Sequence, residues 1–138
     1  MIAEFQISTR GQGLYEFTAD VARWLNASSD GLLTLMVRHT SASLLIQENA
    51  DPDVQRDLLA FFSRAVPRGD DPSMSYLTHT LEGPDDMPAH IKAAMLPISL
   101  SIPVQSGVMT LGTWQGIYLF EHRDAPHVRR VAAHFAAS

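Results

Sequence analysis

Three histidines lie where a metal-binding or proton-transferring side chain could act. His39 ends an apolar strand pattern, His79 interrupts another, and His90 falls in the first turn of a predicted short helix. Imidazole nitrogens bind metal ions and exchange protons near neutral pH. No two of these histidines have the spacing of a helical His-Glu-x-x-His motif. Three partly buried histidines with ordinary hydrogen bonds are therefore an equally good interpretation.

Acidic and amide side chains lie close to these histidines in the sequence. After the strand that ends at His39 come Glu48, Asn49, Asp51 and Asp53, and between His79 and His90 lie Glu82, Asp85 and Asp86. Asp51 precedes a proline and is best explained as a helix N-cap. The paired aspartates at 85 and 86 can likewise cap a helix or lie in a solvated loop. Glu48 and Glu82 have no such local role, which favours them for chemistry.

The segment 111–122 is rich in aromatic and branched side chains and is typical of a strand. Alternation places Gln115 and Glu121 on one face with two aliphatic residues, and Trp114 on the other. A buried, unpaired carboxylate is unfavourable, so Glu121 requires a partner, a ligand or a solvent-filled pocket. Arg129 can neutralise that carboxylate or an anionic ligand. A solvent-exposed position for Arg129 is equally consistent with the sequence.

The composition narrows the class of protein. The chain has 138 residues, a net charge of −5, a single lysine (Lys92) and no cysteine. One domain over 1–138 is expected, without thiolate chemistry or disulfides. Negative charge argues against a nucleic-acid partner, and no apolar run reaches the ~20 residues of a membrane span. Without a secretory signal pattern, a cytoplasmic location is predicted.

The hydrophobic pattern predicts an α+β fold with layered, mostly antiparallel sheets and about three helices. The first two strands are expected to form a hairpin around a glycine-rich turn. Helices are expected over 19–27, 52–65 and 87–95, and strands over 2–8, 14–18, 32–40, 44–47, 75–81, 98–104, 108–121 and 128–135.

Several motifs occur in the order seen in a known family: His-Thr-Ser-Ala-Ser at 39–43, Glu-Asn-Ala-Asp-Pro-Asp-Val at 48–54, Asp86 with Ala-His at 89–90, Gly107, and Leu-Gly-Thr-Trp-Gln at 111–115. Together they resemble the YjbQ-like family, which is often labelled secondary thiamine-phosphate synthase. The resemblance implies a compact trimer of α+β subunits. It also implies a pocket formed by His39, Glu48, Asn49, Asp51, His79, His90, Trp114, Gln115 and Glu121, with Arg129 nearby.

The family label implies that an aminopyrimidine methyl diphosphate is joined to a thiazole phosphate. Such a reaction needs cations for the leaving diphosphate and an aromatic surface for the pyrimidine. Trp114 or Tyr118 could supply the surface, and Arg129 with a divalent metal could hold the diphosphate. A single lysine and the lack of a phosphate-binding loop predict that this activity is weak or secondary.

Two functional hypotheses follow. In the first, the protein is an enzyme with a metal-assisted pocket, whose divalent ion is zinc or magnesium. Its metal ligands would be His39, His79 and His90, its catalytic groups His39, His90, Glu48 and Glu121, and its substrate-binding residues Asn49, Asp51, Trp114, Gln115 and Arg129. In the second, the protein is a non-catalytic trimeric module that binds a small anionic metabolite. A plain interaction scaffold is a third interpretation.

Overall fold

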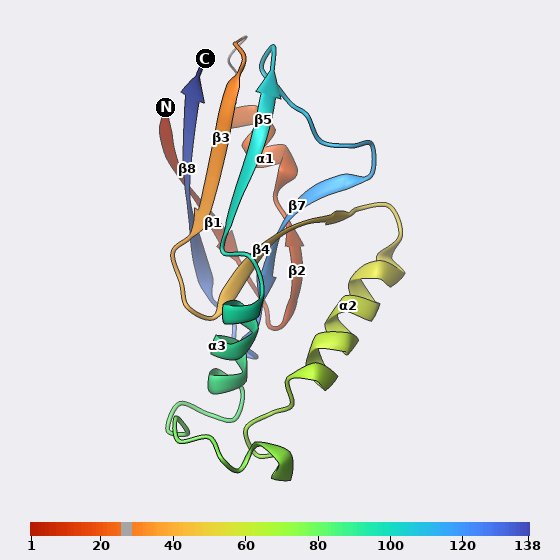
Figure 1. Cartoon of the computed structure of the whole chain (residues 1–138), viewed down its shortest axis with the longest axis vertical. Coiled ribbons are helices and arrows are strands. Elements are labelled where there is room, and N and C mark those ends of the chain that lie inside the picture. The colour runs from red at the N-terminus through yellow and green to blue at the C-terminus, as the bar shows by residue number, and fades with distance from the viewer. Residues whose placement is uncertain (26–28) are drawn as a thin grey trace.

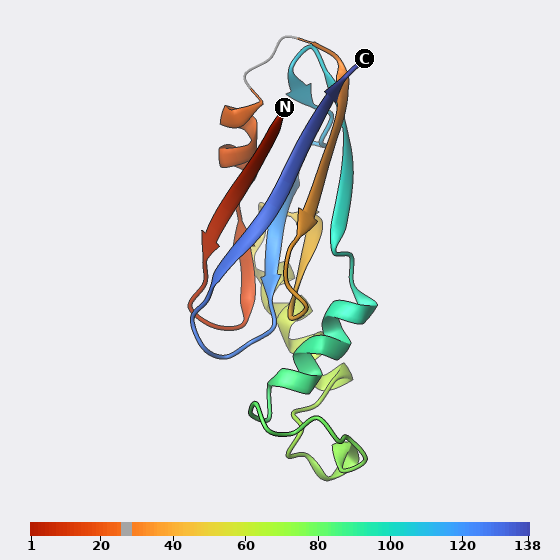
Figure 2. The same ribbon diagram turned by 90° about the vertical axis from the view of Figure 1, so that its left-hand side faces the viewer.

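The computed structural model describes residues 1–25 and 29–138. Its strands form two antiparallel sheets that pack against each other, while helices and loops extend beyond one end of the sheets (Figure 1, Figure 2). The predicted α+β class with layered antiparallel sheets is therefore confirmed. Among the described residues, no helix is both long enough and apolar enough to cross a bilayer.

The larger sheet has five strands in the order β1-β8-β3-β5-β6. These strands are β1 (Ile2–Ser8), β8 (Val128–Ala137), β3 (Gly31–Val37), β5 (Ser99–Gln105) and β6 (Val108–Met109). The smaller sheet has the order β2-β7-β4, from β2 (Gly13–Glu16), β7 (Gln115–Glu121) and β4 (Ala42–Glu48). The helices are α1 (Thr18–Trp24), α2 (Pro52–Ala65) and α3 (Asp86–Met95), with a short 3-10 turn at Pro72–Met74.

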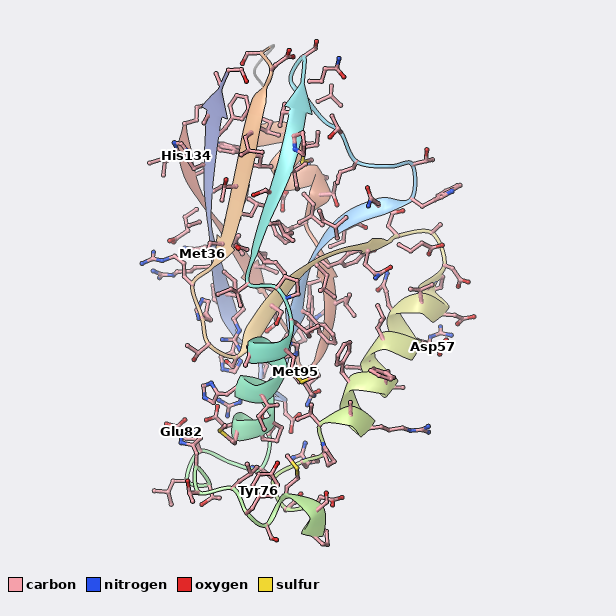
Figure 3. All side chains as sticks on the ribbon, in the orientation of Figure 1. Met36, Asp57, Tyr76, Glu82, Met95 and His134 are labelled. Atoms are coloured by element: carbon pink, nitrogen blue, oxygen red, sulfur yellow. The ribbon has the colours of Figure 1, made fainter. Side chains whose placement is uncertain are left out.

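The hydrophobic core lies between the two sheets. Alternate residues of β3, namely Leu33, Leu35 and Val37, face the smaller sheet, and Ile117 and Leu119 on β7 meet them. The other face of the five-stranded sheet remains open, and Figure 3 shows Met36 and His134 on it. Strand alternation thus produces one buried apolar face and one exposed face.

Helix α2 begins and ends where its sequence predicts. Asp51 is the N-cap, and its Oδ1 accepts a hydrogen bond from the Asp53 amide at 2.9 Å. Pro52 occupies the first helical position, where its missing N–H leaves no hydrogen bond unmade. Helix α1 begins at Thr18 and ends at Trp24, and residues 26–27 of the predicted helix lie outside the described residues.

The predicted hairpin at the N-terminus is wrong. β1 pairs with β8 and β2 pairs with β7, so the two strands belong to different sheets. Gly11, at a φ of +122°, lies in the connection that carries the chain from one sheet to the other. Local alternation and a glycine-rich turn are compatible with either arrangement, and long-range partners decide between them.

Two further strand predictions are also corrected. Residues 75–81 form no strand, because this segment lies beyond the end of both sheets and has no neighbour to pair with (Figure 1). Leu81, at the end of this segment, is 98% exposed. The strand predicted over 108–121 is divided into β6 and β7, because residues 110–114 cross from the larger sheet to the smaller one.

Candidate functional site

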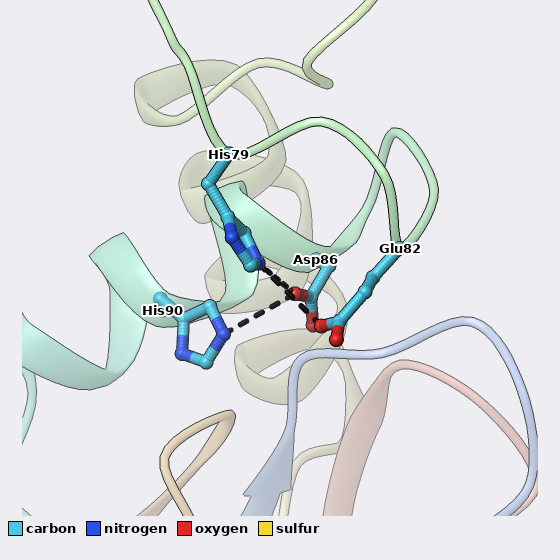
Figure 4. Close-up of side chains that lie close together, drawn as sticks. All are labelled: His79, Glu82, Asp86 and His90. Carbon is cyan, nitrogen blue, oxygen red and sulfur yellow. Dashed lines mark hydrogen bonds and ion pairs between the residues drawn. The ribbon is translucent and has the colours of Figure 1, made fainter.

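Four side chains with metal-binding atoms converge beside α3: His79, Glu82, Asp86 and His90 (Figure 4). One ligand atom from each lies within 4.8 Å of the others. Asp86 and His90 are four residues apart on α3, so they share one helix face. His79 and Glu82 come from the loop that precedes the helix, which folds back over its first turn.

Asp86 is the centre of this cluster, and its side chain is 3% exposed. Its Oδ2 lies 2.6 Å from His79 Nε2 and 3.2 Å from His90 Nε2. Its Oδ1 accepts a hydrogen bond from Arg123 Nη1 at 2.6 Å. Arg123 Nε also donates to Asp85 at 2.8 Å, and Nη2 donates to the Glu82 carbonyl at 3.1 Å. One guanidinium therefore fixes the loop, the start of the helix and the central carboxylate.

These contacts shift the pKa values of two groups in the cluster. Burial by itself raises the pKa of Asp86, but the hydrogen bond from His79 and the charge of Arg123 lower it overall. The same hydrogen bond raises the pKa of His79 above its ordinary value, because the nearby carboxylate favours the imidazolium. Asp86 is thus held as a carboxylate, as a metal ligand must be.

The hydrogen bond that His90 makes to the backbone determines which of its two ring nitrogens faces the cluster. His90 Nδ1 lies 2.9 Å from the Thr40 carbonyl oxygen. A carbonyl can only accept, so Nδ1 carries the proton and donates it. Nε2 is then the nitrogen that faces the Asp86 carboxylate, at 3.2 Å, where it can bind a cation together with that carboxylate or, as an imidazolium, form an ion pair with it. Metal-binding histidines commonly donate their other N–H to a backbone carbonyl in this way.

Pockets flank the cluster on two sides. A pocket of about 310 Å³ includes Leu77, His79 and Met87 in its wall. A second pocket of about 260 Å³ is lined by His39 and His90, together with small and aliphatic residues of α3 and the following loop. A ligand of small size could therefore approach either histidine of the cluster.

His39 lies near the cluster but outside the group of four ligand atoms. Its Nε2 accepts a hydrogen bond from the Arg130 amide at 2.8 Å, so that nitrogen already has a partner. Burial, followed by the charge of Arg129, lowers the pKa of His39 and favours the neutral ring. Of the three predicted metal ligands, the structure brings His79 and His90 together and places His39 across the adjoining pocket.

Glu121 and Arg129 form a buried ion pair between the sheets. Arg129 Nε donates to Glu121 Oε1 at 2.7 Å, and the Thr9 hydroxyl donates to the same oxygen at 2.7 Å. Burial raises the pKa of Glu121, but the hydrogen bonds from Arg129 and Thr9 lower it overall. Arg129 Nη2 also donates to the Ser41 hydroxyl at 2.9 Å. The buried carboxylate of Glu121 is therefore paired with a positive charge within the protein, as its burial requires.

The remaining predicted residues gather at the other end of the smaller sheet: Glu48, Asn49, Asp51, Trp114 and Gln115. Glu48 and Gln115 are partners in the β4–β7 register, and the Asn49 amide donates to the Trp114 carbonyl at 2.9 Å. Gln115 and Glu121 are the two ends of β7, six residue steps and roughly 20 Å apart along the strand. Trp114 is 62% exposed. Within one chain, this group does not join the histidine cluster.

Asp86 and Arg123, which were not selected as site residues from the sequence, differ in the signal that the sequence carries for them. The four-residue spacing of Asp86 and His90 on a predicted helix is a local signal that could have identified this pair. Arg123 is separated from Asp86 by 37 residues, and nothing in the local pattern distinguishes it from a surface arginine. Its role follows from the tertiary structure alone.

Solved structures share this fold across nearly the whole chain. The hypothetical protein APE1520 from Aeropyrum pernix K1 superposes with a TM-score of 0.87 at 28% identity and covers 100% of this chain and 99% of that one. An uncharacterized conserved protein of the yjbq/upf0047 family from Clostridium acetobutylicum gives a TM-score of 0.84 at 34% identity, covering 97% and 99%.

A family model described as UPF0047 protein YjbQ-like matches residues 3–138, and the chain belongs to this family. The UPF0047 protein sll1880 of Synechocystis is 48% identical over 130 residues, covering 93% of this chain and 86% of that protein. The UPF0047 protein YjbQ of Escherichia coli O157:H7 is 43% identical, covering 92% and 91%. The predicted family membership is therefore confirmed, and the family is one of unknown function.

We expect the Glu121–Arg129 pair to be structurally important. Arg129→Met leaves a buried carboxylate without its counter-charge and should lower the free energy of unfolding by about 3–5 kcal/mol. The double variant Glu121→Leu/Arg129→Met should recover much of this loss, because no buried charge remains. Urea denaturation followed by tryptophan fluorescence measures both. Arg56→Met, which removes an exposed pair with Asp53, is the control and should change stability by less than about 1 kcal/mol. Wild-type stability in Arg129→Met would contradict this account.

A second buried group should make stability depend on pH. Burial lowers the pKa of His122 from 6.5 to about 3, and its Nε2 lies 2.8 Å from the Ser43 hydroxyl oxygen. Between these two pKa values the unfolded chain binds more protons, so stability is full above 6.5 and falls as the pH is lowered. From about pH 7.5 to about pH 5.5, His122 should contribute a loss of about 1.4 kcal/mol. Urea denaturation of wild type and His122→Gln at both pH values isolates this contribution, and equal losses in the two proteins would refute it.

Proposed function

We propose that His79, Glu82, Asp86 and His90 bind a divalent metal ion and that this centre supports chemistry on a small anionic molecule. The observation that carries the proposal is the orientation of His90. Its Nδ1 donates to the Thr40 carbonyl, and its Nε2 lies 3.2 Å from a carboxylate oxygen. That arrangement suits a cation held jointly by the imidazole and the carboxylate.

The donor set favours one class of metal. Two imidazole nitrogens with carboxylate oxygens suit zinc and other transition metals, whereas magnesium prefers oxygen ligands and retained waters. Between the two ions expected from the sequence, zinc is therefore the better fit. A metal held there would act as a Lewis acid on an oxygen of the substrate. Arg123 would keep Asp86 in position by holding its other carboxylate oxygen.

The metal proposal predicts stoichiometric zinc binding. Chelator-treated wild-type protein should take up a single zinc ion per chain in isothermal titration, and His79→Ala or His90→Ala should weaken binding by at least about 10-fold. Binding should also weaken as the pH falls, because protons compete for His79, whose pKa is raised. His134→Ala removes an exposed histidine on the open sheet face and should bind zinc normally (Figure 3). Failure to bind zinc, or normal binding by His90→Ala, would disprove the metal centre.

The thiamine-phosphate synthase activity rests on the family resemblance. A metal at this centre would supply a Lewis acid, whereas the aromatic surface expected from Trp114 lies at the other end of the smaller sheet. The alternative is a non-catalytic trimeric module that binds an anionic metabolite. Its trimeric assembly is supported by the outer face of the five-stranded sheet, where Ile2 is 82% exposed and Leu32 and Met36 are nearly half exposed. Apolar patches on a sheet face commonly mark sites of association.

One set of measurements separates these two functions. If the protein is the enzyme, wild type with zinc should join an aminopyrimidine methyl diphosphate to a thiazole phosphate, and His90→Ala should lose this turnover. If the protein is the module, the same compounds should bind in isothermal titration without product formation. In either case, light scattering should show that the wild-type protein is a trimer in solution. The substitution Met36→Glu should weaken association of the trimer. A monomeric wild-type protein would exclude the trimer.

A further inference from the structure

Lys92, the only lysine of the chain, is buried on α3 and is 3% exposed. Its Nζ donates one hydrogen bond, to Gln12 Oε1 at 3.2 Å. An ammonium group has three N–H donors. In the part of the chain that the structure describes, no carboxylate oxygen lies within 4.0 Å of this nitrogen. A buried ammonium group with spare donors and no counter-ion is energetically unfavourable unless something else neutralises it.

Lys92 lies in the wall of a pocket of about 200 Å³ between the end of α2 and α3. Gln12, Ser63, Arg68 and Asp85 supply the other polar groups of this wall. Asp85 already accepts a hydrogen bond from Arg123 at 2.8 Å.

The acid closest to Arg68 is also paired. Asp124 accepts hydrogen bonds from Arg68 Nη1 and Gln12 Nε2, each at 2.8 Å. Both carboxylates near the pocket thus have an arginine as counter-charge. Among the described residues, the ammonium of Lys92 is left without a carboxylate as counter-charge.

We propose that this pocket binds the phosphate group of a small metabolite. An ammonium, a guanidinium and a hydroxyl converge on it from α3, from the loop after α2 and from α2 itself, which suits a tetrahedral oxyanion better than a planar carboxylate. The site is independent of the metal centre. Asp86 and His90 lie on one face of α3, whereas Asp85 and Lys92 lie on the adjacent face, seven residues apart.

A single lysine makes a direct test feasible. Protein labelled with ¹³C and ¹⁵N only at lysine gives one side-chain nitrogen signal, which belongs to Nζ of Lys92. We expect inorganic phosphate to shift this signal saturably in chelator-treated protein, and sodium chloride at matched ionic strength to leave it in place. Acetate should act at least about 10-fold more weakly, because it offers fewer acceptor oxygens. An unmoved signal in phosphate would overturn the proposal, and an equal response to acetate would overturn its preference for phosphate.

Variants of the pocket residues test whether the response to phosphate comes from this pocket. Arg68→Met should weaken phosphate binding by about 10-fold or more, and Lys92→Met should abolish it in isothermal titration. Arg56→Met, at an exposed arginine on α2, is the matched control and should bind like wild type. His90→Ala should also retain the phosphate response, which separates this pocket from the metal centre. A normal response in Arg68→Met would refute the site, and this result does not require Lys92→Met to fold.

Discussion

The buried carboxylate of Asp86 holds the histidine cluster beside α3 together. One of its oxygens contacts His79 and His90, and the other accepts from Arg123. These partners come from the loop before α3, from α3 and from the connection after β7. Without that carboxylate, the guanidinium and the two imidazoles would have no common partner. A charged group in a low-dielectric setting is stable only when its hydrogen bonds are made, so this cluster is ordered as a unit.

The two sheets provide the rigid support on which that cluster is built. β7 lies at the centre of the smaller sheet, and Arg123 is the second residue after its end. Thr40, which orients His90, follows β3 of the larger sheet. The position of the cluster therefore depends on where β7 of the smaller sheet and β3 of the larger sheet end. The Glu121–Arg129 pair joins these ends from within, which explains why an acid on β7 is buried without being part of the exposed site.

Helix α3 serves two surfaces with different chemistry. One face carries Asp86 and His90 toward the proposed metal centre, and the next carries Lys92 toward the proposed phosphate pocket. Arg123 connects them, because it contacts both Asp85 and Asp86. The proposed metal centre and the proposed phosphate pocket therefore lie on neighbouring sides of one short helix.

The sequence by itself determined the α+β class, the boundaries of α2 and the family, because these depend on local periodicity, on the Asp51–Pro52 cap and on contiguous motifs. It also identified His79 and His90 as unusual residues. Only the tertiary structure decided that β1 and β2 belong to different sheets, that Glu121 is neutralised by Arg129, and that Asp86 and Arg123 complete the histidine cluster. Each of these depends on contacts between residues far apart in the chain, and hydrophobic periodicity carries no information about which distant partners meet.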